Sequence, residues 1–423
     1  MRSAGAVPLA AALGLLPATA ARAADLAVPP GDGLAQAIAT AAPGDVLHLA
    51  SGLHRGPITI GTPRLTLQGV PDTVIDGGGT GNAITVVAPD AVLRGLVVRG
   101  SGRSLIDKNA AVFVDRGADR AVVENDRFED NLIAVYLDGP RDALVHGNVI
   151  QGMRDARRNE RGPGVELWNT PGSRVVDNDF SDGRDGVFSV TSRQNVVRGN
   201  HFQHLRFAVH FMYTNTSEVT RNVSGGNDVG YVMMYSDRLR LAGNVSDGDR
   251  EHGLLFNYTN SSRIEGNVVR GSEKAVFIYN ANKNVFRGNW FEGGRIGVHF
   301  TAGSERNEIF ENAFVANQTQ VMYVGTRSLD WAVRGRGNYW SDNAAFDLNG
   351  DGIADTAYRP NDVIDQVIWR APSAKLLMNS PAVQVVRWAQ SSFPAIHPGG
   401  IIDSAPLMTP PRPAALARLK GEP

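Results

Sequence analysis

The stretch "RGNHFQHLRFAVHFMYTNTSEVTRNVSGGNDVGYVMM", residues 198–234, holds two copies of one pattern. Asn200 and Asn222 lie 22 residues apart, and the apolar runs that begin at Ala208 and Gly230 keep the same interval. On both sides of this stretch, asparagine recurs at intervals of 22 to 30 residues. The ten positions are Asn125, Asn148, Asn178, Asn200, Asn222, Asn244, Asn267, Asn289, Asn312 and Asn338. Repetition at a fixed short period is the sequence signature of a solenoid.

The residues within each repeat indicate which solenoid this is. A period near 22, with short β-branched or aromatic runs bounded by Gly and Asn, is too short for helix-pair repeats and lacks their helical periodicity. We therefore predict an all-β fold, a right-handed parallel β-helix in which successive coils lie about 4.8 Å apart. We expect the asparagines to tolerate a left-handed turn and to stack as a hydrogen-bonded ladder. The 30-residue interval after Asn148 predicts a polar inserted loop at 154–164.

The N-terminus has the features of a secretory signal peptide. Arg2 precedes an apolar run at 6–16, and Ala21-Arg22-Ala23 matches the small-x-small cleavage pattern, so we expect export with cleavage after Ala23. A membrane anchor is the alternative, but Pro8, Gly14 and Pro17 interrupt a run that is too short to span a bilayer. The absence of cysteine suits an exported protein that is stabilised by its core.

The remaining chain divides by pattern. The segments that we predict are a signal peptide at 1–23, an N-terminal helical cap at 24–45, a β-helix at 46–340, an Asp/Gly-rich capping loop at 341–365 and an extended C-terminal docking tail at 366–423. Trp340, in the last copy of the Gly-Asn pattern, is expected to close the end of the solenoid. The net charge of −1 gives no electrostatic reason to expect nucleic acid or an anionic membrane as a partner.

Parallel β-helices often belong to polysaccharide lyases, hydrolases and epimerases, so an exported enzyme acting on uronate polymers is the alternative function. Its candidate groups are Asp182 with Asp185, Asp247 with Asp249, and His252 in "EHG". None of them reproduces an aspartate pair with a Gly-His-Gly segment, and no phosphate loop or paired CxxC is present. We assign no catalytic residue and expect the chain not to be an enzyme.

A second kind of site is suggested by "DLNGDGIAD" at 347–355. Oxygen-bearing side chains at alternate positions, followed by a glycine, match the first part of an EF-hand-type calcium loop. The candidate calcium ligands are Asp347, Asn349, Asp351 and Asp355. Tyr358 replaces the glutamate at the twelfth position, so a further ligand such as Asp362 or Asp365 would be needed. The alternative is a loop held by hydrogen bonds to its own backbone.

A candidate copper site lies in the opening stretch. Because Val209 and Phe211 occupy the consistently apolar inward positions, His210 and Met212 should point outward. Met234 takes the position of Met212 one coil later. One imidazole and two thioethers suit Cu(I), and the alternative is that all three are packing residues. The outward column is itself apolar, so either a partner or the C-terminal tail should cover it.

The C-terminal third carries the most specific features. "RGNYWSDNAAFDLNGDGIADTAYRPNDVIDQVIWRAP" at 336–372 and "NSPAVQVVRWAQSSFPAIHPGGIIDSAPLM" at 379–408 closely resemble the NosD family, and the resemblance extends over the whole mature chain. It implies a periplasmic accessory protein that helps to assemble the copper-sulfide centre of nitrous oxide reductase. The implied partners are an ABC transporter of the NosF and NosY type, the copper chaperone NosL and the reductase.

The resemblance also implies a docking role for the tail. In that interpretation 374–396 binds a partner through large apolar anchors, which are Trp369, Leu376, Leu377, Trp388 and Phe393. The alternative is a tail that folds back along the solenoid, and both can hold for different parts of it.

Overall fold

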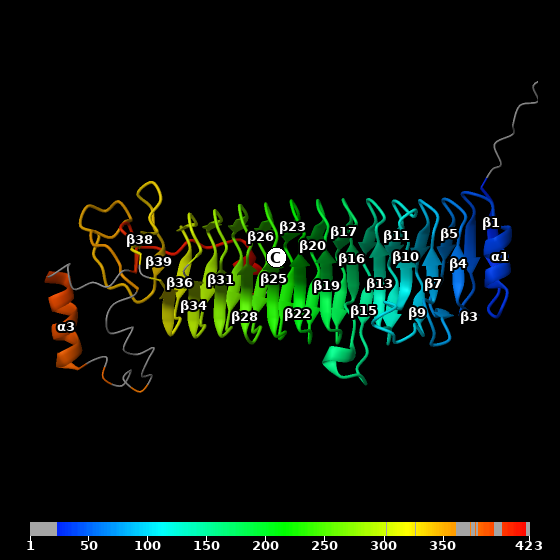
Figure 1. The fold of residues 1–423 in the computed structure, drawn as a ribbon, viewed down its shortest axis with the longest axis horizontal. Helices are drawn as coiled ribbons and strands as arrows, with labels where there is room; N and C mark the ends of the chain where they lie inside the picture. The colour runs from blue at the N-terminus through cyan, green and yellow to red at the C-terminus, as the bar shows by residue number, and fades with distance from the viewer. Residues whose placement is uncertain are drawn as a thin grey trace, which may run out of the picture.

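The computed structural model describes residues 23–301, 303–325, 327–360, 373, 377, 380–392 and 400–419. It is a rod of three parallel sheets, in which successive coils add neighbouring strands (Figure 1). The predicted all-β, right-handed parallel β-helix is confirmed. Within this described part, no helix is both long and apolar enough to cross a membrane.

Sheet A has 13 strands, sheet B has 13 and sheet C has 12. Sheet A consists of β1 (Asp25–Val28), β2 (Val46–Leu49), β5 (Thr66–Gln68), β8 (Val92–Arg94), β11 (Val122–Glu124), β14 (Leu144–His146), β17 (Arg174–Val176), β20 (Val196–Arg198), β23 (Glu218–Thr220), β26 (Arg240–Ala242), β29 (Arg263–Glu265), β32 (Val285–Arg287) and β35 (Glu308–Phe310). Sheet B consists of β3 (Gly52–Arg55), β6 (Thr73–Asp76), β9 (Val97–Arg99), β12 (Arg127–Glu129), β15 (Val149–Gln151), β18 (Asp179–Ser181), β21 (His201–Gln203), β24 (Val223–Gly225), β27 (Val245–Asp247), β30 (Val268–Arg270), β33 (Trp290–Glu292), β36 (Ala313–Val315) and β39 (Tyr339–Trp340).

Sheet C contains the longest strands. They are β4 (Ile58–Ile60), β7 (Ile84–Val86), β10 (Ala110–Val114), β13 (Ile133–Asp138), β16 (Val165–Trp168), β19 (Asp185–Val190), β22 (Phe207–Met212), β25 (Val229–Met234), β28 (His252–Asn257), β31 (Lys274–Tyr279), β34 (Ile296–Thr301) and β37 (Thr319–Val324). The other elements are α1 (Leu34–Thr40), the 3-10 helix η1 (Arg158–Glu160) in the inserted loop, β38 (Leu329–Asp330), α3 (Pro381–Ser392), β40 (Ile401–Ile402) and α4 (Ala415–Leu419).

Alternation along each sheet C strand builds the core. Val209 and Phe211 of β22 are fully buried, in register with Tyr231 and Met233 of β25. Burial of an apolar side chain of this size contributes about 1.5–3 kcal/mol. Because successive side chains alternate between faces, the residue between them, His210, lies on the outer face of sheet C.

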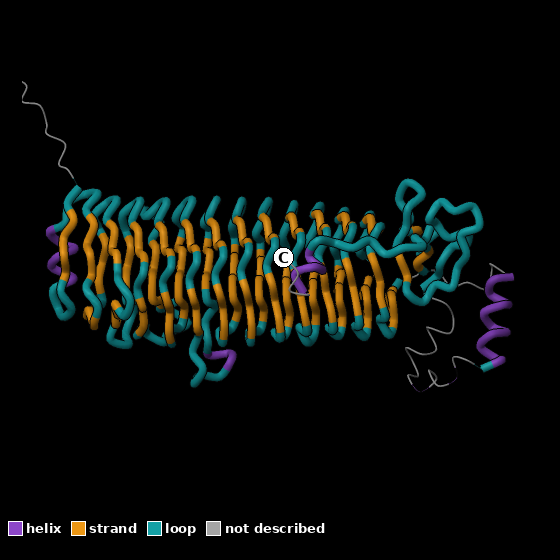
Figure 2. The backbone as a smooth tube through the Cα atoms, turned by 180° about the vertical axis from the view of Figure 1, so that it is seen from behind, coloured by secondary structure: helices purple, strands orange, loops and turns teal. Residues whose placement is uncertain are grey.

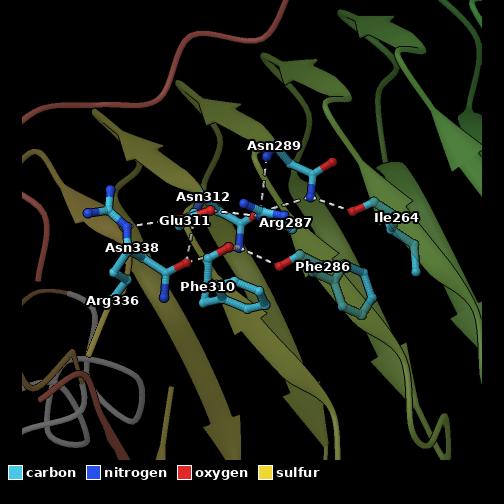
Figure 3. A network of polar contacts seen from close by, with 9 residues as sticks. All are labelled: Ile264, Phe286, Arg287, Asn289, Phe310, Glu311, Asn312, Arg336 and Asn338. Carbon is cyan, nitrogen blue, oxygen red and sulfur yellow. Dashed lines mark hydrogen bonds and ion pairs between the residues drawn. The ribbon is translucent and has the colours of Figure 1, made fainter. Parts of the chain in front are cut away.

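The asparagine ladder runs through the bend between sheets A and B. The backbone amide and the side-chain amide of Asn200 both donate to Oδ1 of Asn222, each at 3.0 Å, and Nδ2 of Asn200 also donates to the carbonyl of Val175. Figure 3 shows the last rungs, where Asn289, Asn312 and Asn338 repeat this geometry. These amides are fully buried, and their hydrogen bonds offset the free-energy cost of removing polar groups from water.

Two details of the ladder differ from expectation. The rung at the N-terminal end is Asp126, whose Oδ1 accepts from the amide of Leu96, and Asn125 occupies the residue before it. The left-handed backbone also belongs to the residue that precedes each rung from Asp126 to Asn312, as at Asn125 with φ 56° and Gly199 with φ 69°. The turn is therefore made one residue early, which lets the asparagine side chain point into the bend instead of adopting the turn itself.

The two ends of the rod are closed differently. At the N-terminal end, α1 buries Leu34 and Ile38, and β1 pairs with β2, so strand stacking begins at Asp25. At the other end the Trp340 ring is 2% exposed and stacks on Phe314, with a centroid distance of 4.4 Å. This confirms Trp340 as the residue that closes the solenoid.

The described parts of the C-terminal segment are not extended throughout. Residues 381–392, expected in an extended tail, form α3 at the end of the rod (Figure 1). β40 then pairs with β38, and the chain runs back along the rod and ends in α4 (Figure 2). Ala415 of α4 packs in a cluster with Val245, Val268 and Trp290 on the outside of sheet B.

Candidate functional site

The proposed copper ligand His210 occupies an unusual environment. Its side chain is 9% exposed, and its ring lies 4.8 Å from the ring of Phe188 and 5.2 Å from the ring of Phe207, measured between centroids. Nδ1 lies 3.6 Å from Oδ2 of Asp185. Neither ring nitrogen has a hydrogen-bond partner, although buried polar groups are nearly always paired.

Asp185 is the carboxylate that faces this imidazole. It is fully buried on β19, and Arg206 donates to both of its oxygens, at 2.9 and 2.7 Å. Burial raises the pKa of Asp185, but the adjacent His210 and Arg206 lower it more, so the pKa lies below the usual carboxyl value. A proton on Nδ1 of His210 would face this carboxylate, which leaves the lone pair of Nε2 for another partner.

Met212 follows His210 by two residues on β22, and Met234 lies on the neighbouring strand β25. Met212 and Met234 are direct register partners on β22 and β25, so their backbones are separated by one strand spacing of about 4.8 Å. Both side chains are partly buried, and alternation places Met212 on the same outer face as His210. The donor set is one imidazole nitrogen and two thioether sulfurs, which is suited to a soft cation such as Cu(I).

A row of tyrosines borders the methionines and was missed in the sequence. Tyr213 stacks on Tyr235 with ring centroids 5.1 Å apart, and Tyr235 stacks on Tyr258 at the same distance. Tyr279 continues the row at 6.0 Å from Tyr258, and all four are more than 40% exposed. Because Tyr213 and Tyr235 directly follow Met212 and Met234, the 22-residue interval between them was a usable signal.

The candidate calcium ligands bond to their own loop. Asp347 accepts hydrogen bonds from the amides of Gly350, Asp351 and Gly352, and Asp355 accepts from the amide of Leu348. Asn349 and Asp351 accept from the amides of Asp351 and Ile353. Asp362 and Asp365 lie outside the described residues. This geometry supports a loop held by its own backbone, which was the alternative to calcium.

Two of the five docking anchors are described. Leu377 is 61% exposed, and Trp388 on α3 is 66% exposed, next to the equally exposed Val385 one turn earlier. Trp369, Leu376 and Phe393 lie outside the described residues. The described anchors therefore present apolar surface to solvent at the end of the rod, where α3 lies (Figure 1).

The acidic groups considered for catalysis have separate structural partners. Asp182 accepts from Nε of Arg154 at 2.8 Å, and Asp247 forms two hydrogen bonds with Arg270. Asp249 is buried and accepts from the hydroxyls of Ser224 and Ser246, each at 2.6 Å. Across the described residues, no group of three or more His, Asp or Glu side chains has the geometry to hold a metal ion.

Solved structures share the fold at low sequence identity. A surface adhesin of Streptococcus pneumoniae, PfbA, matches with a TM-score of 0.54 and 10% identity, covering 69% of this chain and 89% of that one. A family 28 exopolygalacturonase of Yersinia enterocolitica matches with a TM-score of 0.52 and 10% identity, covering 72% and 76%. An adhesin and a hydrolase on one scaffold show that the β-helix does not determine function.

Sequence comparison is more specific. Residues 146–345 match the family described as "Periplasmic copper-binding protein (NosD)". A "Probable ABC transporter binding protein NosD" of Stutzerimonas stutzeri is 40% identical over 379 residues, covering 86% of this chain and 87% of the relative. Its namesake from Pseudomonas aeruginosa is 39% identical over 377 residues, covering 86% and 88%. The chain belongs to the NosD family.

Proposed function

We propose that this chain is a periplasmic accessory protein of nitrous oxide reductase maturation that works with an ABC transporter in assembly of the copper-sulfide centre. The family description, which includes the words periplasmic and copper-binding, supports this, as do the relatives named as ABC transporter binding proteins. The partners are a transporter of the NosF and NosY type, the copper chaperone NosL and the reductase. Export depends on the signal peptide proposed at 1–23, of which residues 1–22 lie outside the described part.

The copper step rests on one observation, which is that His210 is buried with both ring nitrogens unpartnered beside the Met212 and Met234 register pair. Copper(I) is the cargo here and not a resident cofactor. The chain holds it at Nε2 of His210 and the two thioethers, while the carboxylate of Asp185 faces Nδ1 on the other side of the ring. Thioethers bind soft Cu(I) without the deprotonation that a cysteine thiol requires, which suits a chain with no cysteine.

Transporter contact is proposed for the C-terminal end of the rod. Leu377 and Trp388 are exposed there, and Trp369, Leu376 and Phe393 extend the set in sequence. Exposed large apolar residues that cluster on one element are typical of protein interaction sites. Capture of the transporter and of NosL by the mature chain is the direct test, and a Trp388→Ser variant should reduce capture of the transporter.

The accessory role is proposed to be non-enzymatic. The exported uronate-polymer enzyme remains the competing function because a family 28 exopolygalacturonase shares the fold. A catalytic role for its candidate aspartates is weakly supported, since Asp182, Asp247 and Asp249 each form hydrogen bonds with the partners described above. Purified mature chain should leave uronate polymers unchanged in an assay for unsaturated products, reducing ends and epimerised units.

Competition for Cu(I) against a chromogenic chelator tests the copper site. Substitution of Met212 and Met234 by leucine should weaken Cu(I) binding by at least about tenfold while the melting temperature changes little, because Leu and Met have similar volumes. Met322→Leu is the matched control, since Met322 is partly buried on the same outer face of sheet C at β37. Unchanged Cu(I) binding in the double variant, or equal weakening by the control, would contradict this site.

A further inference from the structure

A basic groove lies between the returning C-terminal segment and the outer face of sheet A. Its volume is about 670 Å³, and Pro411 and Pro413 form part of one wall. The charged residues that line it are Arg198, Glu218, Arg221, Arg240, Arg412 and Arg418. Five arginines and one glutamate give a local net charge of +4, in a chain whose overall net charge is −1.

Folding creates this cluster by bringing distant segments together. Arg418 donates through Nη1 to the carbonyl of Arg221 at 3.1 Å and through Nη2 to the carbonyl of Gly243. These bonds attach α4 to residues that lie 197 and 175 positions earlier in the sequence. They also hold two guanidinium groups near each other, and burial together with the charge of Arg221 lowers the pKa of Arg418.

Only part of this positive charge is neutralised within the described residues. Arg240 pairs with Glu218 at 3.3 Å, whereas no carboxylate forms an ion pair with Arg198, Arg221 or Arg412 in the described part of the chain. Elsewhere on the rod, some exposed arginines, such as Arg120 and Arg270, are paired with an aspartate, whereas Arg263 forms no ion pair with a described carboxylate but lies outside the groove. Like charges collected without counter-charges raise the energy of the folded chain unless an anion binds.

The dimensions indicate the kind of anion. The arginines of sheet A come from successive coils, and the lining continues to Gly288, so the groove extends over about 19 Å at one strand spacing of about 4.8 Å per coil. An extended peptide rises about 3.3 Å per residue, so about six residues would fill this length. A single oxyanion would contact only one end.

A membrane surface fits less well. Ala415, Leu416 and Leu419 of α4 pack in a cluster against sheet B, so the larger apolar side chains of this helix are not free to enter a bilayer. The groove itself combines the arginines with small apolar residues such as Val196, Ala242 and Pro411. We propose that this groove binds an extended acidic segment of a partner protein. Its charge, length and location between α4 and sheet A carry the proposal, which is independent of copper binding.

Fluorescence anisotropy with a fluorescein-labelled hexaglutamate peptide tests this on the full mature chain without copper. Arg198→Ala and Arg412→Ala should each weaken binding by about two- to fivefold, the size expected for an exposed ion pair. Binding should also weaken as salt rises, because the groove is open to solvent. Arg263→Ala is the matched control, since Arg263 is exposed on neighbouring β29 of sheet A but does not line the groove.

Three results would overturn the proposal. They are no binding of the peptide at low salt, unchanged binding in both groove variants, and equal weakening by the Arg263 control. Two competing ligands test whether the groove binds another class of molecule. If an oligogalacturonate of equal charge, or vesicles containing anionic lipid, bind more tightly than the peptide and respond to the groove variants, the acidic peptide is not the occupant. Because copper is absent throughout, failure here leaves the copper proposal untouched.

Discussion

Asp403 accepts a hydrogen bond from the backbone amide of Asn338 at 2.6 Å, and so occupies the position where the next asparagine of the ladder would lie. Oδ2 of Asp403 also accepts from Nε1 of Trp340 at 2.8 Å, and Oδ1 accepts from the amide of Ala405 at 3.2 Å. Gly337 leaves room for this carboxylate, because a β-carbon there would overlap it. One buried side chain thus ends the ladder, anchors the closing tryptophan and attaches the returning C-terminal segment.

Asp403→Ala should lower the free energy of unfolding by about 2 kcal/mol or more, because it leaves the buried donors of Asn338 and Trp340 unpaired. Asp403→Asn should lose less, since it keeps one acceptor oxygen. Urea unfolding followed by tryptophan fluorescence measures both, and limited proteolysis reports release of residues 400–419. An Asp403→Ala protein as stable as the parent would show that the tail is held elsewhere.

The same residue predicts a pH dependence. Burial raises the pKa of Asp403, so the folded chain holds this proton more strongly than the unfolded chain does. The contribution of Asp403 to stability is therefore fully present below the unfolded carboxyl pKa and is lost as pH rises through the folded value. As pH rises, the Asp403→Asn protein should become more stable relative to the parent. A difference that stays constant between pH 4 and pH 7 would contradict this.

Within the ladder, Asn200→Ala should cost about 3 kcal/mol, because it leaves the donors of Asn178 and the carbonyl of Val175 unpaired in a fully buried bend. The matched control is Asn159→Ala in the exposed η1 turn, which should stay within about 0.5 kcal/mol of the parent. Chemical denaturation compares the two. Equal effects at both positions would mean that the ladder contributes little to stability.

Two histidines on sheet C predict acid sensitivity. Burial and the nearby Lys274 lower the pKa values of His252 and His299 to about 4. The unfolded chain therefore binds more protons between pH 4 and pH 6.5, and stability should fall as pH decreases through this range. Replacing both by asparagine should flatten the slope of unfolding free energy against pH. An unchanged slope in the double variant would be inconsistent with neutral buried imidazoles.

Calcium removal should leave the chain unchanged. The oxygens of Asp347, Asn349, Asp351 and Asp355 already accept hydrogen bonds from amides of their own loop. We expect the melting temperature to be the same with excess EGTA as with millimolar calcium. A calcium-dependent rise in melting temperature that Asp347→Asn abolishes would instead restore the calcium site.

The period of the sequence predicted most of the fold because neighbouring coils repeat the same local pattern. It placed Met212 opposite Met234, since a 22-residue offset is one coil. The interval alone could not show that the rung is Asp126 and not Asn125. The two are adjacent, and the choice depends on which of them makes the left-handed turn. Asp185 was noticed as an acid but not as the partner of His210, which lies 25 residues further on, outside the repeat interval.

The repeat interval could not predict the contacts of the C-terminal segment. Asp403 lies 65 residues after Asn338, and Arg418 lies 197 residues after the carbonyl that it contacts at Arg221. Such pairs follow from the course of the whole chain and carry no local signature. The basic groove arises only from this return, since its two walls are far apart in sequence.

The accessory role is tested most directly by the copper-sulfide content of nitrous oxide reductase from a strain that lacks this chain. We predict a reductase without its copper-sulfide centre, measured by metal analysis and the visible absorption spectrum. Complementation with the parent should restore the centre, whereas the Met212→Leu, Met234→Leu variant should restore it only in part. A reductase with normal copper-sulfide content in the deletion strain would contradict the account.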